Sequence, residues 1–204
     1  MLRAHGIACV RGDRRLFSGV DFQVSAGEWL QVEGANGAGK TSLLRIVAGL
    51  ARPEEGELHW DERPVDEVRD EFNARLLYLG HAPAIKDDLT ALENLQTAAA
   101  VAGRPLDEST ALAALRRIGL KGREDLPTRV LSQGQKRRVA LARLLCSQAR
   151  LWVLDEPFVA LDVAAVAMLC GILDEHLGRG GMVLFTSHQA VQLGGAGGSL
   201  RLDH

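Results

Sequence analysis

Residues 34–42 read Gly-Ala-Asn-Gly-Ala-Gly-Lys-Thr-Ser, and this stretch constrains the fold of the chain more than any other. It matches the phosphate-binding pattern G-x-x-x-x-G-K-[ST]. Residues 29–33 read as a short buried strand that enters it, and a helical pattern at residues 43–48, ended by Gly49, follows it. In that setting glycines let backbone N–H groups converge on phosphate oxygens, and the helix N-terminus adds the positive end of its dipole. The sequence therefore predicts a strand, a phosphate loop and a helix in succession.

The loop has chemistry suited to a nucleotide and a metal ion. Lys40 can reach the β- and γ-phosphates as a point charge, and the Thr41 hydroxyl can ligate Mg²⁺. A plain glycine-rich turn before a helix is the alternative, and we disfavour it because every specified position of the pattern is present in the right context. We expect nucleotide to be bound by the whole loop: Gly34, Ala35, Asn36, Gly37, Ala38, Gly39, Lys40, Thr41 and Ser42.

Composition narrows the class of protein. With 204 residues, 47% hydrophobic and 25% charged, the chain can form one sizeable core with room for an inserted subdomain. Its N-terminus has no long apolar run, so we expect no signal peptide, and the longest apolar stretch, residues 163–173, is about half a bilayer span. Three widely spaced cysteines and six scattered histidines predict reduced thiols and no zinc or covalent haem site.

The net charge is −2, but acidic and basic residues are unevenly distributed along the chain. Residues 54–71 carry nine acids against two arginines, and residues 116–150 carry ten bases against two acids. A basic block can bind nucleic acid, but aromatic residues for base stacking are scarce there. We interpret the block as a solvated helical face near bound phosphates.

Apolar patterns place the remaining elements. Thr90 and Glu93 form a capping box that opens a helix through Ala102, and an apolar face marks a second helix that Gly119 ends. The other expected elements are strands at residues 2–10 and 20–24 around a polar turn at 11–15, strands at 57–60, 76–79, 151–154 and 182–186, a helix at 163–177, and a loop at 194–198. The fully apolar 76–79 segment is typical of a central parallel strand. We therefore expect a single domain over residues 1–204, with an α/β core at about 1–81 and 149–204 and a helical insertion at about 82–148.

A second motif lies at the end of an apolar strand, where residues 151–156 read Leu-Trp-Val-Leu-Asp-Glu. Phosphoryl transfer with Mg²⁺ needs an acid that holds the metal's water shell and a group that orients the attacking water. Asp155 suits the first role and Glu156 the second. An Asp-Glu pair alone usually marks a strand end in solvent, but downstream of a phosphate loop it indicates a hydrolytic site.

A third motif directs backbone groups at an anion. Residues 131–135 read Leu-Ser-Gln-Gly-Gln and lead into a basic helical segment. Ser132 and Gln135 form a capping box, so the segment is a helix N-terminus, and Gly134 permits close backbone approach. One chain therefore carries two phosphate-directed sites about 95 residues apart.

These motifs resemble those of the ATP-binding cassette (ABC) ATPases, and the resemblance covers nearly the whole chain. Residues 34–42 correspond to Walker A, 131–135 to the signature, 151–156 to Walker B and 160–162 to the D-loop, and His188 is the switch histidine. The resemblance implies an α/β P-loop NTPase fold of the ABC type. Such a fold has a RecA-like core with an antiparallel β subdomain and an inserted α-helical subdomain.

The family also implies roles for single residues. Glu156, His188 and Lys40 are the catalytic candidates of an ATP hydrolase whose cofactors are ATP and Mg²⁺. A second copy of the chain is implied as a partner, paired head to tail. In that dimer the signature of one copy, at Ser132, Gly134 and Gln135, binds the ATP held by Walker A of the other.

Some positions depart from the family pattern. The metal set that the resemblance implies is Thr41, Asp155 and His81, and His81 stands where the family usually has glutamine. Arg11 stands where the family places an aromatic ring that stacks on adenine, and we assign it to nucleotide binding on that alignment. Gln133 replaces a usually small residue in the signature.

Within the family the chain most resembles the haem-exporter ATPases of cytochrome c biogenesis. The matching phrases are residues 15–19, 30–34, 78–81, 85–86, 151–158 and 180–183. That resemblance implies a haem-transporting ATPase, an ABC-type translocase. It would power haem export, or release of a haem-loaded chaperone, through separate integral membrane subunits of the CcmB or CcmC type. It also implies a peripheral position on the cytoplasmic face of the bacterial inner membrane, with no direct haem or nucleic-acid site on this chain.

Three other functions compete with this one. The chain could be the ATPase subunit of a different small-substrate exporter. A soluble ABC protein acting on nucleic acid or ribosomes usually has two cassettes or long coiled coils, and this chain has neither. A pure nucleotide-binding regulator is disfavoured because Glu156 and His188 are both present.

Overall fold

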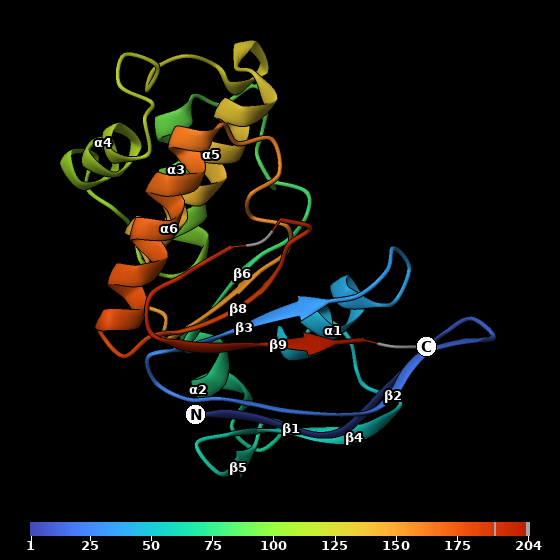
Figure 1. Cartoon of the computed structure of the whole chain (residues 1–204). Coiled ribbons are helices and arrows are strands. Elements are labelled where there is room, and N and C mark those ends of the chain that lie inside the picture. The colour runs from blue at the N-terminus through green and yellow to red at the C-terminus, as the bar shows by residue number, and fades with distance from the viewer. Residues whose placement is uncertain (190, 203–204) are drawn as a thin grey trace. The chain divides into compact units, whose positions relative to one another are not determined.

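Two units make up the computed structural model, which describes residues 1–189 and 191–202 (Figure 1). The first, called here the core unit, contains Met1–Tyr78, Ala149–Pro157 and Leu173–His204. The second, the helical unit, contains Leu79–Gln148 and Phe158–Ile172. The chain passes from the helical unit to the core unit within α6 (Val163–Gly178).

A five-stranded sheet forms the centre of the core unit. Its strands are, in spatial order, β6 (Leu76–Leu79), β7 (Leu151–Leu154), β8 (Met182–Thr186), β3 (Glu28–Glu33) and β9 (Ala196–Arg201). β3 pairs in parallel with β8 and β9, and β7 pairs in parallel with β8. Every residue of β7 and β8 is buried, as expected for strands that are apolar except for Thr186 at the end of β8. Because β7, β8 and β3 are parallel neighbours, the residues that follow these strands meet at one edge of the sheet.

A second, antiparallel sheet completes the core unit. Its order is β2 (Arg14–Val24), β1 (Leu2–Arg11), β4 (Glu55–Trp60) and β5 (Arg63–Pro64). The inner side chains of this sheet share one hydrophobic cluster with β3, β7, β8 and the buried side of α1 (Lys40–Val47). The short helix α2 (Arg69–Ala74) adds Phe72, whose ring packs edge-on against Trp60 at a centroid distance of 5.2 Å.

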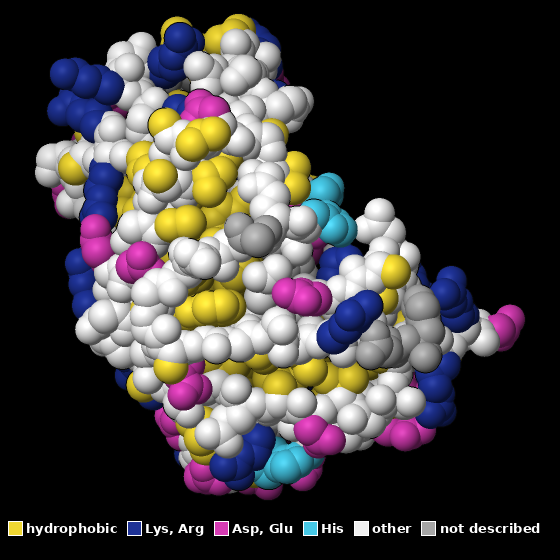
Figure 2. Space-filling model, viewed as in Figure 1, with side chains coloured by type: hydrophobic (Ala, Val, Ile, Leu, Met, Phe, Trp, Pro, Cys, Tyr) yellow, Lys and Arg dark blue, Asp and Glu magenta, His cyan; other side chains and the backbone are white. Residues whose placement is uncertain are grey.

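The helical unit is built on capped helices. These are α3 (Ala91–Val101), α4 (Glu108–Arg117) and α5 (Gln133–Leu145), with the 3₁₀ turn Thr128–Val130 before α5. Thr90, Asp107 and Ser132 cap the three α-helices, each accepting a bond from the backbone N–H three residues later. Hydrophobic side chains also gather at the surface where α6 runs, as Figure 2 shows, and Val163 is 88% exposed. Within the described residues, no helix has the length and apolar character that a bilayer crossing requires.

The structure confirms the expected strands 76–79, 151–154 and 182–186 and the two capping boxes. Three expectations about the two sheets are wrong. The segment 76–79 is an edge strand rather than a central one, and only Leu79 is fully buried, because apolar residues also form half-buried edge strands. β2 begins at Arg14, so the polar turn is shorter than expected.

The third error is the loop at 194–198, part of which is β9. β9 pairs with β3, and the Trp29 indole lies over Gly197, where a Cβ would be 2.0 Å from the ring. Glycine is weak as a strand former but is needed where another group approaches the backbone this closely. The sequence pattern also gave no indication of α2 or β5.

Candidate active site

The phosphate loop joins β3 to α1, and its glycines are required by the space around them. A Cβ at Gly34 would be 2.9 Å from the Leu202 carbonyl oxygen, and one at Gly39 would be 2.8 Å from the Phe17 ring. Gly39 is in the left-handed region, with φ at 99°, and is the N-cap of α1 without a side-chain cap. The helix begins at Lys40, inside the motif, and not at residue 43 as the pattern suggested. Its first N–H groups are therefore directed into the loop.

Lys40 lies across the loop that carries it. Its Nζ donates to the carbonyl oxygens of Gly34 at 2.8 Å and Ala35 at 3.2 Å, and the residue is only 9% exposed. Thr41, the next residue, is exposed. A cation and a hydroxyl thus stand together at the positive end of a helix, an arrangement suited to an anion with an associated metal ion.

Asp155 and Glu156 follow β7 and are joined to β8 through one hydroxyl. Thr186 Oγ1 donates to Asp155 Oδ1 at 2.9 Å and accepts from the Glu156 N–H at 2.8 Å. Thr186 is fully buried and Asp155 is 1% exposed. Glu156 has a left-handed backbone, with φ at 52°, which costs a non-glycine residue about 1–3 kcal/mol and is found mostly at functional sites.

His188 lies beside Glu156, two residues beyond the end of β8. Its Nε2 is 3.2 Å from Glu156 Oε1, and the side chains are 57% and 12% exposed respectively. The backbone before it is held by Gln31, whose Nε2 donates to the Ser187 carbonyl at 3.4 Å. His188 also lines a cavity of about 570 Å³ together with Gly34 of the phosphate loop. The loop, the acids and the histidine are therefore brought together at the edge where β3, β7 and β8 end.

Arg11 ends β1 and is exposed beside the phosphate loop. It is two residues from Cys9, so the two side chains share a face of the strand. Burial raises the pKa of the Cys9 thiol, while a hydrogen bond with Ser42 and the charge of Arg11 act in the opposite direction. Cys9 therefore connects the loop to the strand that Arg11 ends, and the adenine-facing role of Arg11 stays a prediction.

The signature belongs to the helical unit. Ser132 Oγ accepts from the Gln135 N–H at 3.3 Å, and the Ser132 N–H donates to Gln135 Oε1 at 2.9 Å. A Cβ at Gly134 would be 2.7 Å from the Ala160 carbonyl oxygen, so the D-loop backbone requires glycine there. The basic block was expected to be a solvated face, and that is wrong for Arg137, which is 7% exposed.

The predicted metal ligands fit the ion unequally. Asp155 and Thr41 offer oxygen atoms, which Mg²⁺ prefers, and Mg²⁺ commonly uses one or two such groups, with waters and phosphates filling its other positions. His81 is an exposed imidazole in the helical unit, and its metal role stays a prediction. No group of three or more His, Cys, Asp or Glu side chains that could hold a metal ion by itself occurs in residues 1–189 and 191–202.

Two residues near the acids were not singled out from the sequence. Thr186 is the only polar residue of β8, and a polar residue at the end of a buried strand is a signal that could have been used. Tyr78 lies on β6, the neighbour of β7 in the sheet, and burial and the charge of Asp155 raise the pKa of its hydroxyl.

Comparisons with known proteins place the chain among nucleotide-binding transport proteins. The family model described as "ABC transporter" matches residues 17–159. A protein of Dechloromonas aromatica named "Cytochrome c biogenesis ATP-binding export protein CcmA" is 56% identical, over 95% of this chain and 95% of its own length. Proteins of the same name from Methylococcus capsulatus and Escherichia coli K12 are 52% and 49% identical, over 99% and 95% of this chain and 98% and 91% of theirs.

Solved structures agree on the fold. An ABC transporter ATP-binding protein from Pyrococcus furiosus superposes with a TM-score of 0.84 at 24% identity, covering 98% of this chain and 96% of the other. The cassette MJ0796, described as a dimeric post-hydrolysis state bound to ADP and Pi, gives 0.81 at 23% identity, over 93% of this chain and 88% of its own. The fold class expected from the sequence is confirmed.

Proposed function

This chain belongs to the ABC transporter ATP-binding family, and on that premise we propose that it hydrolyses ATP to drive an exporter in cytochrome c biogenesis. The observation that carries the hydrolytic part is the convergence of the phosphate loop, the Asp155–Glu156 pair and His188 at one sheet edge. The pathway is supported by near-full-length relatives, 49–56% identical, whose name describes an export protein of that pathway.

We propose a separate task for each group. The loop amides and Lys40 would bind the ATP phosphates, and Thr41 and Asp155 would hold Mg²⁺, which would supply positive charge against the phosphates. Glu156 orients the attacking water and accepts its proton. His188 Nε2 lies 3.2 Å from Glu156 Oε1. It can orient that carboxylate by a hydrogen bond, or donate to the γ-phosphate when ATP is bound.

The signature motif is proposed to act on a second copy. Ser132 and Gln133 are exposed at the N-terminus of α5, which is where a phosphate would be received. A head-to-tail dimer would bring Ser132, Gly134 and Gln135 to the ATP of the partner copy. The dimeric state described for MJ0796 supports this arrangement.

We further propose a peripheral position on the cytoplasmic face of the bacterial inner membrane. The membrane-spanning part would come from separate subunits of the CcmB or CcmC type, and the work done would be haem export or release of a haem-loaded chaperone. The support is the name of the relatives, which describes an ATP-binding export protein.

Glu156→Gln tests the hydrolytic assignment. The amide has the same shape but accepts no proton, so turnover should fall by about 10²–10⁴-fold while ATP still binds. Size-exclusion chromatography with ATP and Mg²⁺ should then show a dimer. Glu108→Gln, at an exposed position in the first turn of α4, is the matched control and should hydrolyse ATP normally. Unchanged turnover in Glu156→Gln would refute the assignment.

A deletion strain tests the pathway separately. Loss of this protein should leave haem synthesis intact but deplete cytochromes c that carry covalent haem, measured by haem staining of denaturing gels. Restoration by the wild-type gene, and not by the Glu156→Gln gene, would tie the defect to hydrolysis. Normal staining in the deletion strain would overturn the pathway and leave the ATPase assignment standing.

A further inference from the structure

Two edge strands lie on the same side of the core unit. β9 ends the five-stranded sheet and, among the described residues, pairs with β3 alone. β2 ends the antiparallel sheet and also contacts β3, so both edges are on the β3 side of the unit. An unpaired strand edge presents a row of main-chain donors and acceptors, which makes it a template for pairing with another chain.

The main chain of β9 has hydrogen-bonding groups that point away from β3. The Leu202 N–H donates to the Glu33 carbonyl oxygen at 2.9 Å, so Leu202 directs its groups towards β3. This direction alternates along a strand, and two residues of β9 on the other side of the alternation are Gly197 and Ser199. Their N–H and C=O groups therefore point outwards, away from the sheet.

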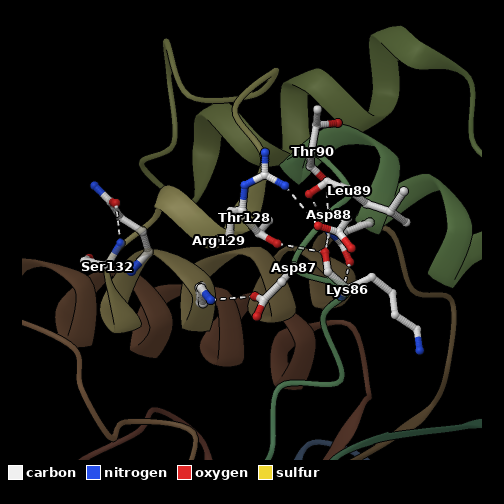
Figure 3. A network of polar contacts seen from close by, with 11 residues as sticks. Lys86, Asp87, Asp88, Leu89, Thr90, Thr128, Arg129 and Ser132 are labelled. Atoms are coloured by element: carbon white, nitrogen blue, oxygen red, sulfur yellow. Dashed lines mark hydrogen bonds and ion pairs between the residues drawn. The ribbon is translucent and has the colours of Figure 1, made fainter.

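Main-chain groups outside regular pairing are met by side chains elsewhere in this chain. Figure 3 shows one case, the Lys86 carbonyl oxygen, which accepts from Thr128 Oγ1 at 2.9 Å. Within the described part of the chain, the outward groups of Gly197 and Ser199 have no such partner, and five of the six residues of β9 are exposed. These groups are therefore available to an added strand.

An apolar strip runs beside the β9 edge. It consists of Val20 and Phe22 of β2, Leu30 of β3 and Leu200 of β9, which pack against the core cluster but are only partly buried. Figure 2 shows hydrophobic side chains at the surface directly below the place that β9 has in Figure 1. The core thus reaches the surface here, and covering the strip would remove apolar area from water.

Gly198 leaves a space in this strip. It is in register with Leu30, so the two positions share the face of the sheet that packs on the core cluster. A Cβ at Gly198 would meet no atom within 4 Å apart from its chain neighbours, whereas a Cβ at Gly197 would be 2.0 Å from the Trp29 ring. A side chain of an added strand would therefore fit beside Leu30.

The charges at the two ends of β9 differ in sign. Arg201 ends β9 and Arg14 begins β2, and both are exposed. Both lie towards the phosphate loop, because Arg201 is in register with Glu33, which precedes the loop, and Leu16 contacts the loop itself. The other end of β9 is in register with Glu28. An acidic residue of a bound segment therefore belongs at the phosphate-loop end.

We propose that the β9 edge and the apolar strip bind an extended segment of a partner protein, added antiparallel to β9 as a further strand. Antiparallel pairing is slightly more stable per residue than parallel pairing. The segment pairs with the outward groups of Gly197 and Ser199 and buries apolar side chains at alternate positions against the strip. Its N-terminal end carries an acidic residue near Arg201.

A second copy of the chain is the weaker occupant. Its own β9 has glycine at two of six positions and Leu200 as its only large apolar side chain, so it has little to bury in the strip. The site uses none of the catalytic candidates, and the inference goes beyond the proposed function.

A synthetic peptide tests the site. It has about nine residues, enough to span β9, with aspartate first and valine and threonine alternating after it. Fluorescence anisotropy of a dye at its C-terminus should show saturable binding to the full chain. A peptide that begins with lysine should bind about two- to fivefold more weakly, since exposed charge contacts contribute little.

Ser199→Pro removes an outward N–H without removing a bond to β3. Proline has no N–H, and edge strands accept it where that group would face solvent. Peptide affinity should fall by about tenfold or more, because a main-chain bond is lost and the ring obstructs the edge. Ser199→Ala is the matched control. It keeps the N–H and should bind the peptide within about twofold of the wild-type chain.

Gly198→Val separates binding from stability. Gly198 has no left-handed backbone and valine is favoured in strands, so the melting temperature should rise or stay unchanged. The same side chain occupies the space beside Leu30, so peptide affinity should fall by about tenfold. A misfolded variant would instead lose stability and binding together. Arg201→Glu should reverse the charge preference and bind the lysine peptide more tightly than the aspartate peptide.

Several results would overturn the inference. One is the absence of peptide binding to the wild-type chain. Another is equal binding to Ser199→Pro and Gly198→Val, or an unchanged charge preference in Arg201→Glu, since the peptide would then be bound elsewhere. A third is self-association of the wild-type chain without ATP that Ser199→Pro abolishes, because a second copy would then be the occupant. No readout uses ATP, so each of these results leaves the hydrolytic assignment standing.

Discussion

Thr186→Val removes one hydroxyl at the point where the two acids are joined to β8. Valine has nearly the shape of threonine, so the packing of the fully buried side chain is preserved. What is lost is the bond donated to Asp155 Oδ1 at 2.9 Å and the bond accepted from the Glu156 N–H at 2.8 Å.

The structure gives the size of the effect. A bond to a carboxylate contributes about 1.5–3 kcal/mol and a neutral backbone bond about 1 kcal/mol, so the free energy of unfolding should fall by about 2.5–4 kcal/mol. Glu156 also loses the hydrogen bond from its N–H that holds its backbone in the left-handed conformation. A shift of about 1 Å in a reacting group can cost about 10²-fold in rate, and we expect kcat to fall by about that factor.

Two assays separate stability from catalysis. Urea unfolding gives the free energy of unfolding, and steady-state ATP hydrolysis below the melting range gives kcat and KM. KM should change little because the phosphate loop is untouched. Thr186→Ser is the control, since it keeps both hydrogen bonds and loses one buried methyl group, worth about 1 kcal/mol.

A Thr186→Val protein that hydrolyses ATP as fast as Thr186→Ser would show that the hydroxyl does not position Glu156. Equal losses of kcat in the two variants would point to packing as the cause. Either result would refute the reasoning from these hydrogen bonds.

Three further predictions concern single residues. Lys40→Ala should abolish ATP binding or hydrolysis because it removes the cation from the loop, and normal turnover would contradict the Walker A assignment. If Arg11 stacks on adenine, Arg11→Ala should weaken ATP binding about 2- to 30-fold and Arg11→Tyr should restore it, as titration with a fluorescent analogue would show. Burial lowers the pKa of His176, stacked on Trp152, from 6.5 to about 4. The unfolded chain therefore takes up the proton first, and stability should fall as the pH drops from about 6.5 to about 4. His176→Gln should lose that fall in urea unfolding at pH 7.5 and pH 5, and an unchanged fall would contradict it.

The motifs were predictable because their signals are local. A phosphate loop, a capping box at Ser132 and an apolar strand ending in Asp155 are each contained within a few consecutive residues. Strand pairing is not local. Thr186 bonds to Asp155 and Glu156, which lie 31 and 30 positions earlier in the chain. This contact depends on β7 and β8 being neighbours in the sheet, which no short sequence pattern encodes.

The errors have physical causes of the same kind. The 194–198 stretch was predicted as a loop because glycine is disfavoured in strands, yet Gly197 is needed beneath the Trp29 ring. The basic block was expected to face solvent, and Arg137 is buried because two main-chain carbonyls happen to lie within its reach. Which of several neighbouring arginines is buried depends on the path of a distant segment.

The placement of Trp29 over Gly197 has a spectroscopic consequence. Trp29 lines the cavity that also includes Gly34 and His188, so its fluorescence should respond to changes around the phosphate loop. The chain has three tryptophans and one tyrosine. The other two indoles, Trp60 and Trp152, lie against Arg150 and His176 and are not among the described residues that line that cavity. Replacing those two with phenylalanine would leave one native tryptophan, whose emission should follow nucleotide occupancy without any added dye.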